Sequence, residues 1–356
     1  MKTDKKVVPA VKKYLICLSL LGVLAGCQTE EKPVVKEEKA APEVSEPEGA
    51  IDTYQFPLTG EQANQAVTDR PVAVMINNHP KARPQAGLQE ADIVYEALAE
   101  GDITRFLAIF HSQNPSFIGP IRSARDYYID LSSGYDALYI CHGWSPEAKE
   151  ILESGTVDYL NGLFYDGILF ERASFKKAPH NSYISYENIL KGAELKGYEM
   201  KEQVEPLLFY EDFPGIEGEA AQRISIAYSK GSISKVEYVY NNKDERYDRF
   251  TSNEQLIDYH TKTPVQVDNL FIVEMDHQII DQVGRRDIDL ISGGRGYLIQ
   301  KGKAQAVQWE NKDGKILPYK DGSLVPLLKG NTWINIVPSS PGINDMVSIQ
   351  SDEKGV

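Results

Sequence analysis

Arginine residues recur at strand ends and in loops of the first half of the chain, in a pattern that suggests binding of an anion. The candidate ligand-binding residues are Arg83, Arg105, Arg122, Ser123, Arg125, Asp126, His180 and Asn181. A guanidinium group presents a planar fork of hydrogen-bond donors that matches a phosphate or a carboxylate. Most of these segments leave predicted strands, where α/β folds place their sites. We hypothesise that Arg105, Arg122 and Arg125 contact the ligand, with His180 and Asn181 as accessory residues.

A structural role explains the same arginines equally well. Each of them can pair with a nearby carboxylate such as Asp92, Glu96 or Asp126. Structural ion pairs leave the same pattern in a sequence as a binding site does. Both interpretations therefore stay open at this point.

The established catalytic and cofactor motifs are missing from the sequence. It contains no Walker-type P-loop, no G-x-G-x-x-G opening a helix, no H-E-x-x-H, no C-x-x-C and no G-x-S-x-G. The six histidines have no metal-ligand spacing, so no metal site is expected. The sequence identifies no cofactor and does not decide whether the protein is an enzyme.

Two lobes that differ in predicted secondary structure are expected to position the candidate residues. Residues 55–204 are expected to form an α/β (α+β) lobe and residues 205–350 a β-rich lobe. In the first lobe, strands are predicted at 71–76, 92–97, 103–110 and 135–142, and helices at 146–153 and 187–195. In the second, alternating apolar residues predict strands at 223–228, 236–240, 247–250, 270–274, 296–300, 304–309 and 332–337. The segment 92–97 also has the composition of a short helix.

The N-terminus has the pattern of an export signal followed by a lipid anchor. Five lysines within the first 13 residues precede an uncharged, mostly apolar run from Tyr14 to Gly26. The run ends in Leu24-Ala25-Gly26-Cys27, which resembles the bacterial lipobox. We therefore predict a signal peptide over residues 1–26, acylation of Cys27, and an acidic, disordered tether over residues 27–54. An uncleaved signal anchor is the alternative.

Composition narrows the class of protein further. The chain has 356 residues, is 42% hydrophobic and carries a net charge of −14. Residues 1–26 hold a net charge of +4 and residues 28–50 a net charge of −4, so the predicted lobes retain about −14. This acidity argues against nucleic-acid binding. Cys141 is the one cysteine outside the export region, and its apolar strand context predicts a small buried hydrophobe instead of a nucleophile.

Several motifs after the tether resemble the YerB-like family of bacterial lipoproteins. They are Val74-Met75-Ile76-Asn77-Asn78-His79-Pro80, Arg83-Pro84-Gln85-Ala86-Gly87-Leu88, Ala91-Asp92-Ile93-Val94-Tyr95-Glu96, Thr104-Arg105-Phe106, Gly119-Pro120-Ile121-Arg122-Ser123-Ala124-Arg125, Ala178-Pro179-His180-Asn181 and Gly330-Asn331-Thr332-Trp333. The resemblance covers nearly all of the chain after the tether. It implies a lipid-anchored envelope protein with two recurring domains and no settled activity.

A second resemblance links residues 104–150 to the core of LytR-CpsA-Psr proteins, which move glycopolymers from a polyprenyl-pyrophosphate carrier onto peptidoglycan. Ser123-Ala124-Arg125-Asp126 takes the place of that family's S-R-x-D-like motif. In that setting an arginine would neutralise pyrophosphate and an aspartate could hold a divalent cation. The motif departs from the family pattern, since Ala124 separates the serine from the arginine.

Together these observations predict a lipid-anchored protein on the extracellular face of the cell membrane that binds an anionic envelope ligand. A cell-wall polymer or a lipid-linked precursor is the candidate partner. One alternative is a pyrophosphate-dependent transferase that uses Arg125 and Asp126. Another is a non-catalytic scaffold for cell-wall enzymes, in which the arginines are structural.

Overall fold

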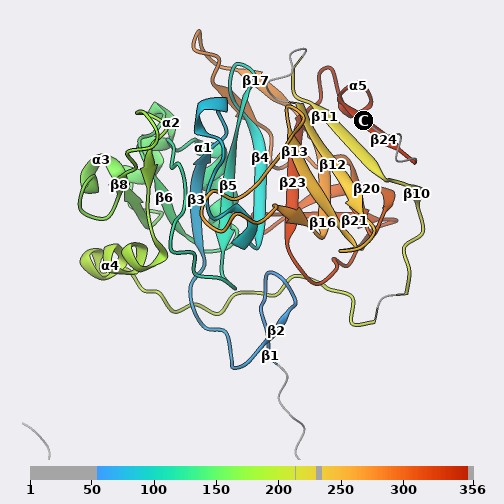
Figure 1. The fold of residues 1–356 in the computed structure, drawn as a ribbon, viewed down its shortest axis with the longest axis horizontal. Coiled ribbons are helices and arrows are strands. Elements are labelled where there is room, and N and C mark those ends of the chain that lie inside the picture. Colours follow the sequence, from blue (N-terminus) through green and yellow to red (C-terminus); the bar gives the residue numbers. More distant parts are fainter. Residues whose placement is uncertain (1–53, 213, 230–234, 352–356) are drawn as a thin grey trace, which may run out of the picture. The chain divides into compact units, whose positions relative to one another are not determined.

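The fold was obtained as a computed structural model that describes residues 54–212, 214–229 and 235–351 (Figure 1). Residues 52–356 form one compact unit by their internal contacts. None of the helices in the described ranges is long and apolar enough to span a bilayer. The predicted signal peptide, Cys27 and almost all of the predicted tether lie outside the described residues.

A large mixed sheet runs through the whole unit and takes strands from both predicted lobes. In spatial order its strands are β22 (Ser323–Leu324), β21 (Lys315–Lys320), β20 (Lys303–Lys312), β19 (Gly294–Gln300), β16 (Asn269–Met275), β23 (Thr332–Pro338), β4 (Ile93–Glu100), β5 (Ile103–Phe110), β3 (Val72–Asn77), β6 (Leu138–Cys141) and β7 (Tyr159–Asn161), with β10 (Glu219–Ala220) beside β20. The two lobes meet where β23 pairs in parallel with β4. Main-chain hydrogen bonds therefore join segments that are far apart in the sequence.

A second sheet covers one face of the large sheet. Its strands are β14 (Glu254–Gln255), β13 (Arg246–Thr251), β12 (Lys235–Asn241), β11 (Arg223–Ala227) and β24 (Val347–Gln350), with β15 (Gln266–Val267) beside β13. Figure 1 shows β11, β12 and β13 in front of β16 and β23. The core between the sheets includes Val74 and Phe106 from the large sheet and Ile224 and Tyr238 from the second. Burial alternates along β12, as expected for a strand with one solvated face.

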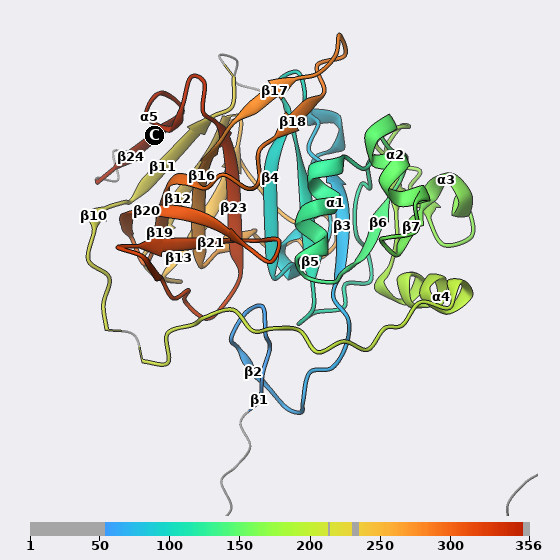
Figure 2. The same ribbon diagram turned by 180° about the vertical axis from the view of Figure 1, so that it is seen from behind.

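Two helices, α1 (Asp126–Ser133) and α2 (Pro146–Glu153), cover the opposite face of the large sheet. The other helices of the described residues are α3 (Gly162–Tyr165), α4 (Tyr186–Lys196) and α5 (Ile343–Met346), and buried residues of α4 and α5 belong to the core that the second sheet shares. Figure 2 shows α1 on the near side of β3 and β5. Ile129 of α1 and Leu152 of α2 share a core with Met75 and Leu107 of the sheet. Because β3 and β5 are covered on both faces, their residues are almost all buried, which accounts for their continuous apolar runs.

Short elements complete the unit. They are the strand pairs β1 (Tyr54–Gln55) with β2 (Gln62–Ala63), β8 (Glu171–Arg172) with β9 (Ser182–Tyr183), and β17 (His277–Ile279) with β18 (Arg286–Ile288), and the 3-10 turns Pro80–Ala82 and Leu88–Glu90. The pair β8–β9 and the turn Pro80–Ala82 carry residues of the candidate site described below.

The structure confirms the predicted elements and part of the predicted fold class. Every strand listed in the sequence analysis is present, segment 92–97 is a strand, and both predicted helices form. The C-terminal region is β-rich, but the N-terminal lobe is not clearly α/β. Its β4 and β5 form a hairpin and β5 pairs antiparallel with β3, so only β3, β6 and β7 are parallel neighbours. The hairpin arises because Gly101 turns the chain with a φ of 55°, which favours glycine.

Candidate functional site

The structure divides the predicted site residues among separate environments. Arg105, Ser123 and Arg125 surround Glu100, whereas Arg83 lies beside the second sheet. Arg122, His180 and Asn181 lie near the carboxyl ends of β3 and β6. Ion pairing and hydrogen bonding in the first two environments decide which arginines are available to a ligand.

Arg105 and Arg125 are buried and paired with the same carboxylate. The Arg105 guanidinium donates to Glu100 Oε2 at 2.6 Å and to the Ser123 carbonyl at 2.7 Å. Arg125 forms an ion pair with the other oxygen of Glu100. Burial lowers the pKa of both arginines. These contacts fix the loop before α1 to β5, so the geometry favours a positioning role for both residues.

Asp126 lies near two other acidic residues, Asp287 and Glu147. It opens α1, and burial raises the pKa of its carboxyl, as do the nearby Asp287 and Glu147. The described residues contain no group of three or more histidine, cysteine or acidic side chains arranged to hold a metal ion.

Arg83 is held by the loop from which it comes. Its Nε donates to Asn78 Oδ1 at 3.1 Å and its Nη2 to the Asn78 carbonyl at 3.0 Å. Burial, followed by the charge of Arg249, lowers the pKa of Arg83 to about 10. Arg83 also lines an open pocket with Glu254 and Leu256, at the edge of the second sheet.

The third environment is a basic cluster, which we define as His79, Arg122, His142, Arg172 and His180. The parallel strands β3, β6 and β7 end at this position; His142 follows β6 directly, and His79 lies two residues after the end of β3. The rings of His79 and His180 stack with centroids 4.6 Å apart. His142 Nε2 lies 2.8 Å from Arg172 Nη2. The carboxyl ends of parallel strands are where open α/β sheets bind ligands.

Polar neighbours orient the side chains of the basic cluster. Asn77 Nδ2 lies 2.9 Å from His180 Nδ1, and Ser182 Oγ lies 2.8 Å from His142 Nδ1. Arg172 Nη1 donates to Asn181 Oδ1 at 3.2 Å. Gly162 is required beside His142, because a Cβ at this position would lie 2.1 Å from His142 Nδ1. The ring therefore packs directly against the backbone that opens α3.

Positive charge dominates the electrostatics of the basic cluster. Burial is the main cause that lowers the pKa of both His79 and His180. The charges of Lys81, Arg122 and Arg83 lower the pKa of His79 further. The pKa of His180 is lowered further by His79, Arg122, Lys81 and Lys176. Burial, followed by the charge of Arg105, lowers the pKa of Arg122 to about 10. Asp166 pairs with Arg172 at 2.9 Å.

Arg122 differs from the other predicted arginines in its lack of a partner. Its side chain is half-buried, and it makes no hydrogen bond or ion pair with any residue in the described ranges. Its main chain is held, since the Arg122 N–H donates to the Met75 carbonyl at 2.9 Å. A half-desolvated guanidinium without a carboxylate partner, on a main chain that is held in place, is suited to an external anion.

Sequence reasoning placed Arg122, His180 and Asn181 among the candidates but missed His79, His142 and Arg172. The missed histidines had a usable signal, because each lies near the end of a predicted strand: His142 closes 135–142, and His79 comes three residues after 71–76. Metal-ligand spacing was the wrong criterion for these histidines, because they share a position at strand ends and not a spacing along the chain.

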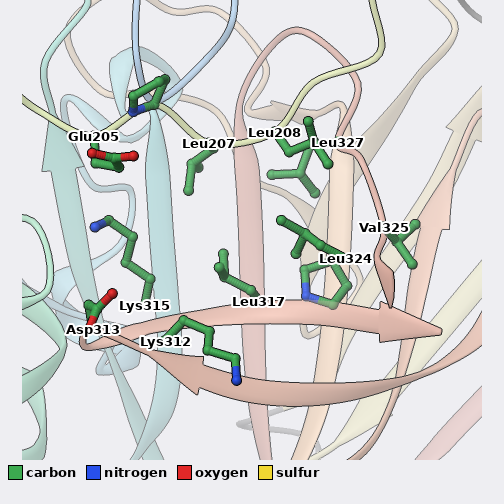
Figure 3. Close-up of a pocket in the computed structure, with 12 residues that line it drawn as sticks. Glu205, Leu207, Leu208, Lys312, Asp313, Lys315, Leu317, Leu324, Val325 and Leu327 are labelled. Carbon is green, nitrogen blue, oxygen red and sulfur yellow. The ribbon is translucent and has the colours of Figure 1, made fainter. Parts of the chain in front are cut away.

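An apolar pocket elsewhere in the fold contains none of the predicted site residues (Figure 3). Its cavity of about 110 Å³ lies between the chain at Leu207 and Leu208 and the strands that carry Leu317 and Leu324. Figure 3 shows leucine side chains from both segments facing the same space. Apolar lining of this kind packs well but supplies few groups for chemistry.

Comparisons with known proteins identify the family. Residues 58–199 match the family described as "Protein of unknown function (DUF3048) N-terminal domain", and residues 224–334 match its C-terminal domain. A Bacillus subtilis (strain 168) protein named "Putative lipoprotein YerB" is 54% identical over 333 residues, which cover 92% of this chain and 96% of the relative. The crystal structure of the YerB protein from Bacillus subtilis matches with a TM-score of 0.78 and 52% identity, covering 83% of this chain and 99% of that chain.

Proposed function

This chain belongs to the DUF3048 family, and we propose that it is a lipid-anchored envelope protein that binds an anionic ligand through its basic cluster. The ligand carries a phosphate or a carboxylate. Attachment to the extracellular face of the membrane through Cys27 belongs to the same proposal. The lipobox-like sequence at Leu24–Cys27 supports that attachment, as does the lipoprotein name of the Bacillus subtilis relative.

The unpartnered guanidinium of Arg122 is the observation that carries the proposal. Arg105 and Arg125 share Glu100, whereas no carboxylate in the described ranges pairs with Arg122. His79, His142 and His180 supply further donors around it when an anion favours their protonation. The transferase alternative is less well supported, because Arg125, which would have to neutralise pyrophosphate, already pairs with Glu100.

Replacing Arg122 with glutamine is expected to weaken binding of inorganic phosphate by at least about tenfold. The change removes charge-assisted hydrogen bonds, which contribute about 1.5–3 kcal/mol each. Titration calorimetry of the soluble segment 52–356 measures the affinity. This segment contains both cores of the fold and all described elements, so it can be studied without the N-terminal residues.

Arg223→Gln is the matched control for this measurement. Arg223 is also half-buried, lies on β11 of the second sheet, and has no ion pair within the described ranges. Its replacement changes the net charge by the same amount but should leave phosphate affinity unchanged. Equal affinities for Arg122→Gln and the wild type would contradict the proposal and favour the scaffold alternative.

Binding of sulfate is expected to strengthen as the pH falls from about 8 toward 5. The free protein holds the pKa of His79 and His180 below the ordinary value, through burial and neighbouring cations. A bound anion stabilises the protonated rings and raises these pKa values, so binding takes up protons. Sulfate keeps a constant charge over this range, which leaves the histidines as the titrating groups.

NMR titration of the histidine ring protons checks this pH dependence. The resonances of His79 and His180 should titrate at higher pH in saturating sulfate than in its absence. His111 lies at the opposite end of the β3–β5 pair and serves as an internal control whose titration sulfate should not move. An affinity for sulfate that is independent of pH would show that these histidines do not face the anion.

A further inference from the structure

The segment from Leu163 to Phe175 exposes large apolar side chains beside the basic cluster. Leu163 is 54% exposed, Phe164 56%, Ile168 69% and Phe175 47%. Single exposed apolar residues are common on protein surfaces, but a group of them within one short segment marks an interaction surface. The segment includes α3 and β8, which lie at one end of the large sheet in Figure 1.

Contacts join Leu163 and Phe164 to the loop that carries His142. Phe164 packs against Trp144 with ring centroids 5.6 Å apart, and Trp144 lies two residues after His142. The Asn161 side chain accepts hydrogen bonds from the Leu163 N–H at 3.0 Å and the Gly143 N–H at 2.9 Å. The loops after β6 and β7 are therefore held side by side.

Basic side chains outnumber acidic ones around the same segment. Arg172 belongs to the basic cluster and pairs with Asp166, Lys177 is exposed after the segment, and Lys81 is exposed beside His79 and His180. Lys176 donates to the carbonyls of Ala82 and Pro84, which ties the loop at 176 to the turn after β3. Together with the basic cluster they give an excess of positive charge, against a net charge of −14 for the whole chain.

We propose that this surface, formed by the basic cluster together with Leu163, Phe164, Ile168 and Phe175, docks onto a lipid bilayer that contains anionic headgroups. The apolar side chains enter the interfacial region of the bilayer, and Arg122 with its neighbouring histidines holds a lipid phosphate. Apolar insertion combined with attraction of cations to anionic lipid is the general basis of interfacial binding. The inference rests on the proposed anion-binding function and names the lipid headgroup as its ligand.

The length of the N-terminal region is compatible with this docking. Residues 28–53 separate Cys27 from the first described residue, Tyr54. A chain of this length spans at most about 90 Å when fully extended. An acyl anchor at Cys27 therefore leaves the docking surface free to reach the membrane to which the protein is attached.

Vesicle binding by the soluble segment 52–356, which lacks the anchor, tests the inference. Vesicles of phosphatidylglycerol mixed with phosphatidylcholine are compared with vesicles of phosphatidylcholine alone, at low and at high salt. Trp144 reports insertion, because it is half-buried beside Phe164, whereas Trp309 and Trp333 are buried in the core. We expect a blue shift of the fluorescence and salt-sensitive binding with the anionic vesicles only.

Two double variants distinguish the loss of exposed apolar side chains from a loss of folded structure. Phe164→Ser with Ile168→Ser should weaken binding to anionic vesicles by about tenfold or more, because it removes the inserting side chains. Its affinity for soluble inorganic phosphate should stay at the wild-type value, which also shows that the site is folded. The control is Ile279→Ser with Ile291→Ser, which removes equally exposed apolar groups, 65% and 76% exposed, near β17–β18 and should bind vesicles like the wild type.

The outcomes distinguish failure of the docking inference from failure of the proposed function. Phosphate binding without vesicle binding overturns the docking inference and leaves the anion-binding proposal intact. Vesicle binding that survives the Phe164 and Ile168 replacements, or equal binding to neutral vesicles, also overturns the docking inference. Absence of phosphate binding in the wild type overturns the proposed function itself, and with it the assignment of a lipid phosphate to Arg122.

Discussion

Replacing Glu96 with alanine is expected to lower the free energy of unfolding by about 3–5 kcal/mol, because it leaves a buried arginine without its counter-charge. Glu96 on β4 and Arg249 on β13 are both fully buried, and Glu96 Oε2 lies 2.8 Å from Arg249 Nη2. The pair joins the large sheet to the second sheet. When one partner is removed, the charge of the other stays buried without a counter-charge.

The surroundings of the pair explain why each charge needs the other to be stable in the core. Glu96 Oε1 accepts hydrogen bonds from Thr104 at 2.9 Å and from Asn78 at 3.3 Å. The Arg249 guanidinium carbon lies 4.6 Å from the centroid of the Trp333 ring, a geometry suited to a cation–π contact. Burial alone would lower the pKa of Arg249, but Glu96 and Tyr238 raise it above its ordinary value.

A double-mutant cycle provides the decisive measurement. Glu96→Ala and Arg249→Met are each expected to destabilise the protein, and the double variant should be more stable than the sum of the two single effects implies, because no unpaired charge remains. Denaturant unfolding of the soluble segment 52–356 at pH 7 gives all four free energies. Single variants that each lose less than about 1 kcal/mol would contradict the argument.

Arg105 and Arg125 pair with a carboxylate, as one of the two open interpretations had it, but the sequence did not identify which carboxylate. Nearby carboxylates were expected as alternative partners, but Asp92 accepts hydrogen bonds from His111 and Ser112 instead. Both arginines pair with Glu100. Strict alternation along β4 would place Glu100 on the same face of the sheet as Leu98, away from Arg105.

An irregularity in the hairpin moves Glu100 to the face of its partners. The register of β4 with β5 shifts between Leu98 and Glu100, so that Glu100 lies opposite Ile103. Ile103 and Arg105 share a face because they are two residues apart on a strand. A bulge of this kind depends on pairing between strands, and a single sequence contains no direct signal for it.

The fold was predictable to the extent that local patterns decide it. Continuous apolar runs identified β3 and β5, and Ser145 with Pro146 identified the start of α2, where the serine caps the helix as expected. The parallel pairing of β23 with β4 was not predictable, because apolar pattern does not say which distant strand will be a neighbour. For the same reason the sequence did not predict the Glu96–Arg249 ion pair, whose partners come from different sheets.

Replacing Cys27 with serine is expected to release the protein from the membrane almost completely. The predicted modification attaches a diacylglyceryl group to the Cys27 sulfur, and a serine hydroxyl does not replace the thiol in that reaction. Each buried methylene contributes about 0.8 kcal/mol, and two acyl chains give stable anchoring where a single chain is marginal. The loss of both acyl chains therefore removes most of the free energy that holds the protein to lipid.

Fractionation of cells that express the full-length chain measures this release, with a fatty-acid probe to report acylation. Cys17→Ser is the matched control, because Cys17 lies within the predicted signal peptide and its replacement leaves Cys27 in place. A high-salt wash separates the two modes of attachment. It should remove residual Cys27→Ser protein held by the docking surface, because that contact depends on screened charges. Protein that stays in the membrane after the wash would instead identify residues 1–26 as an uncleaved signal anchor.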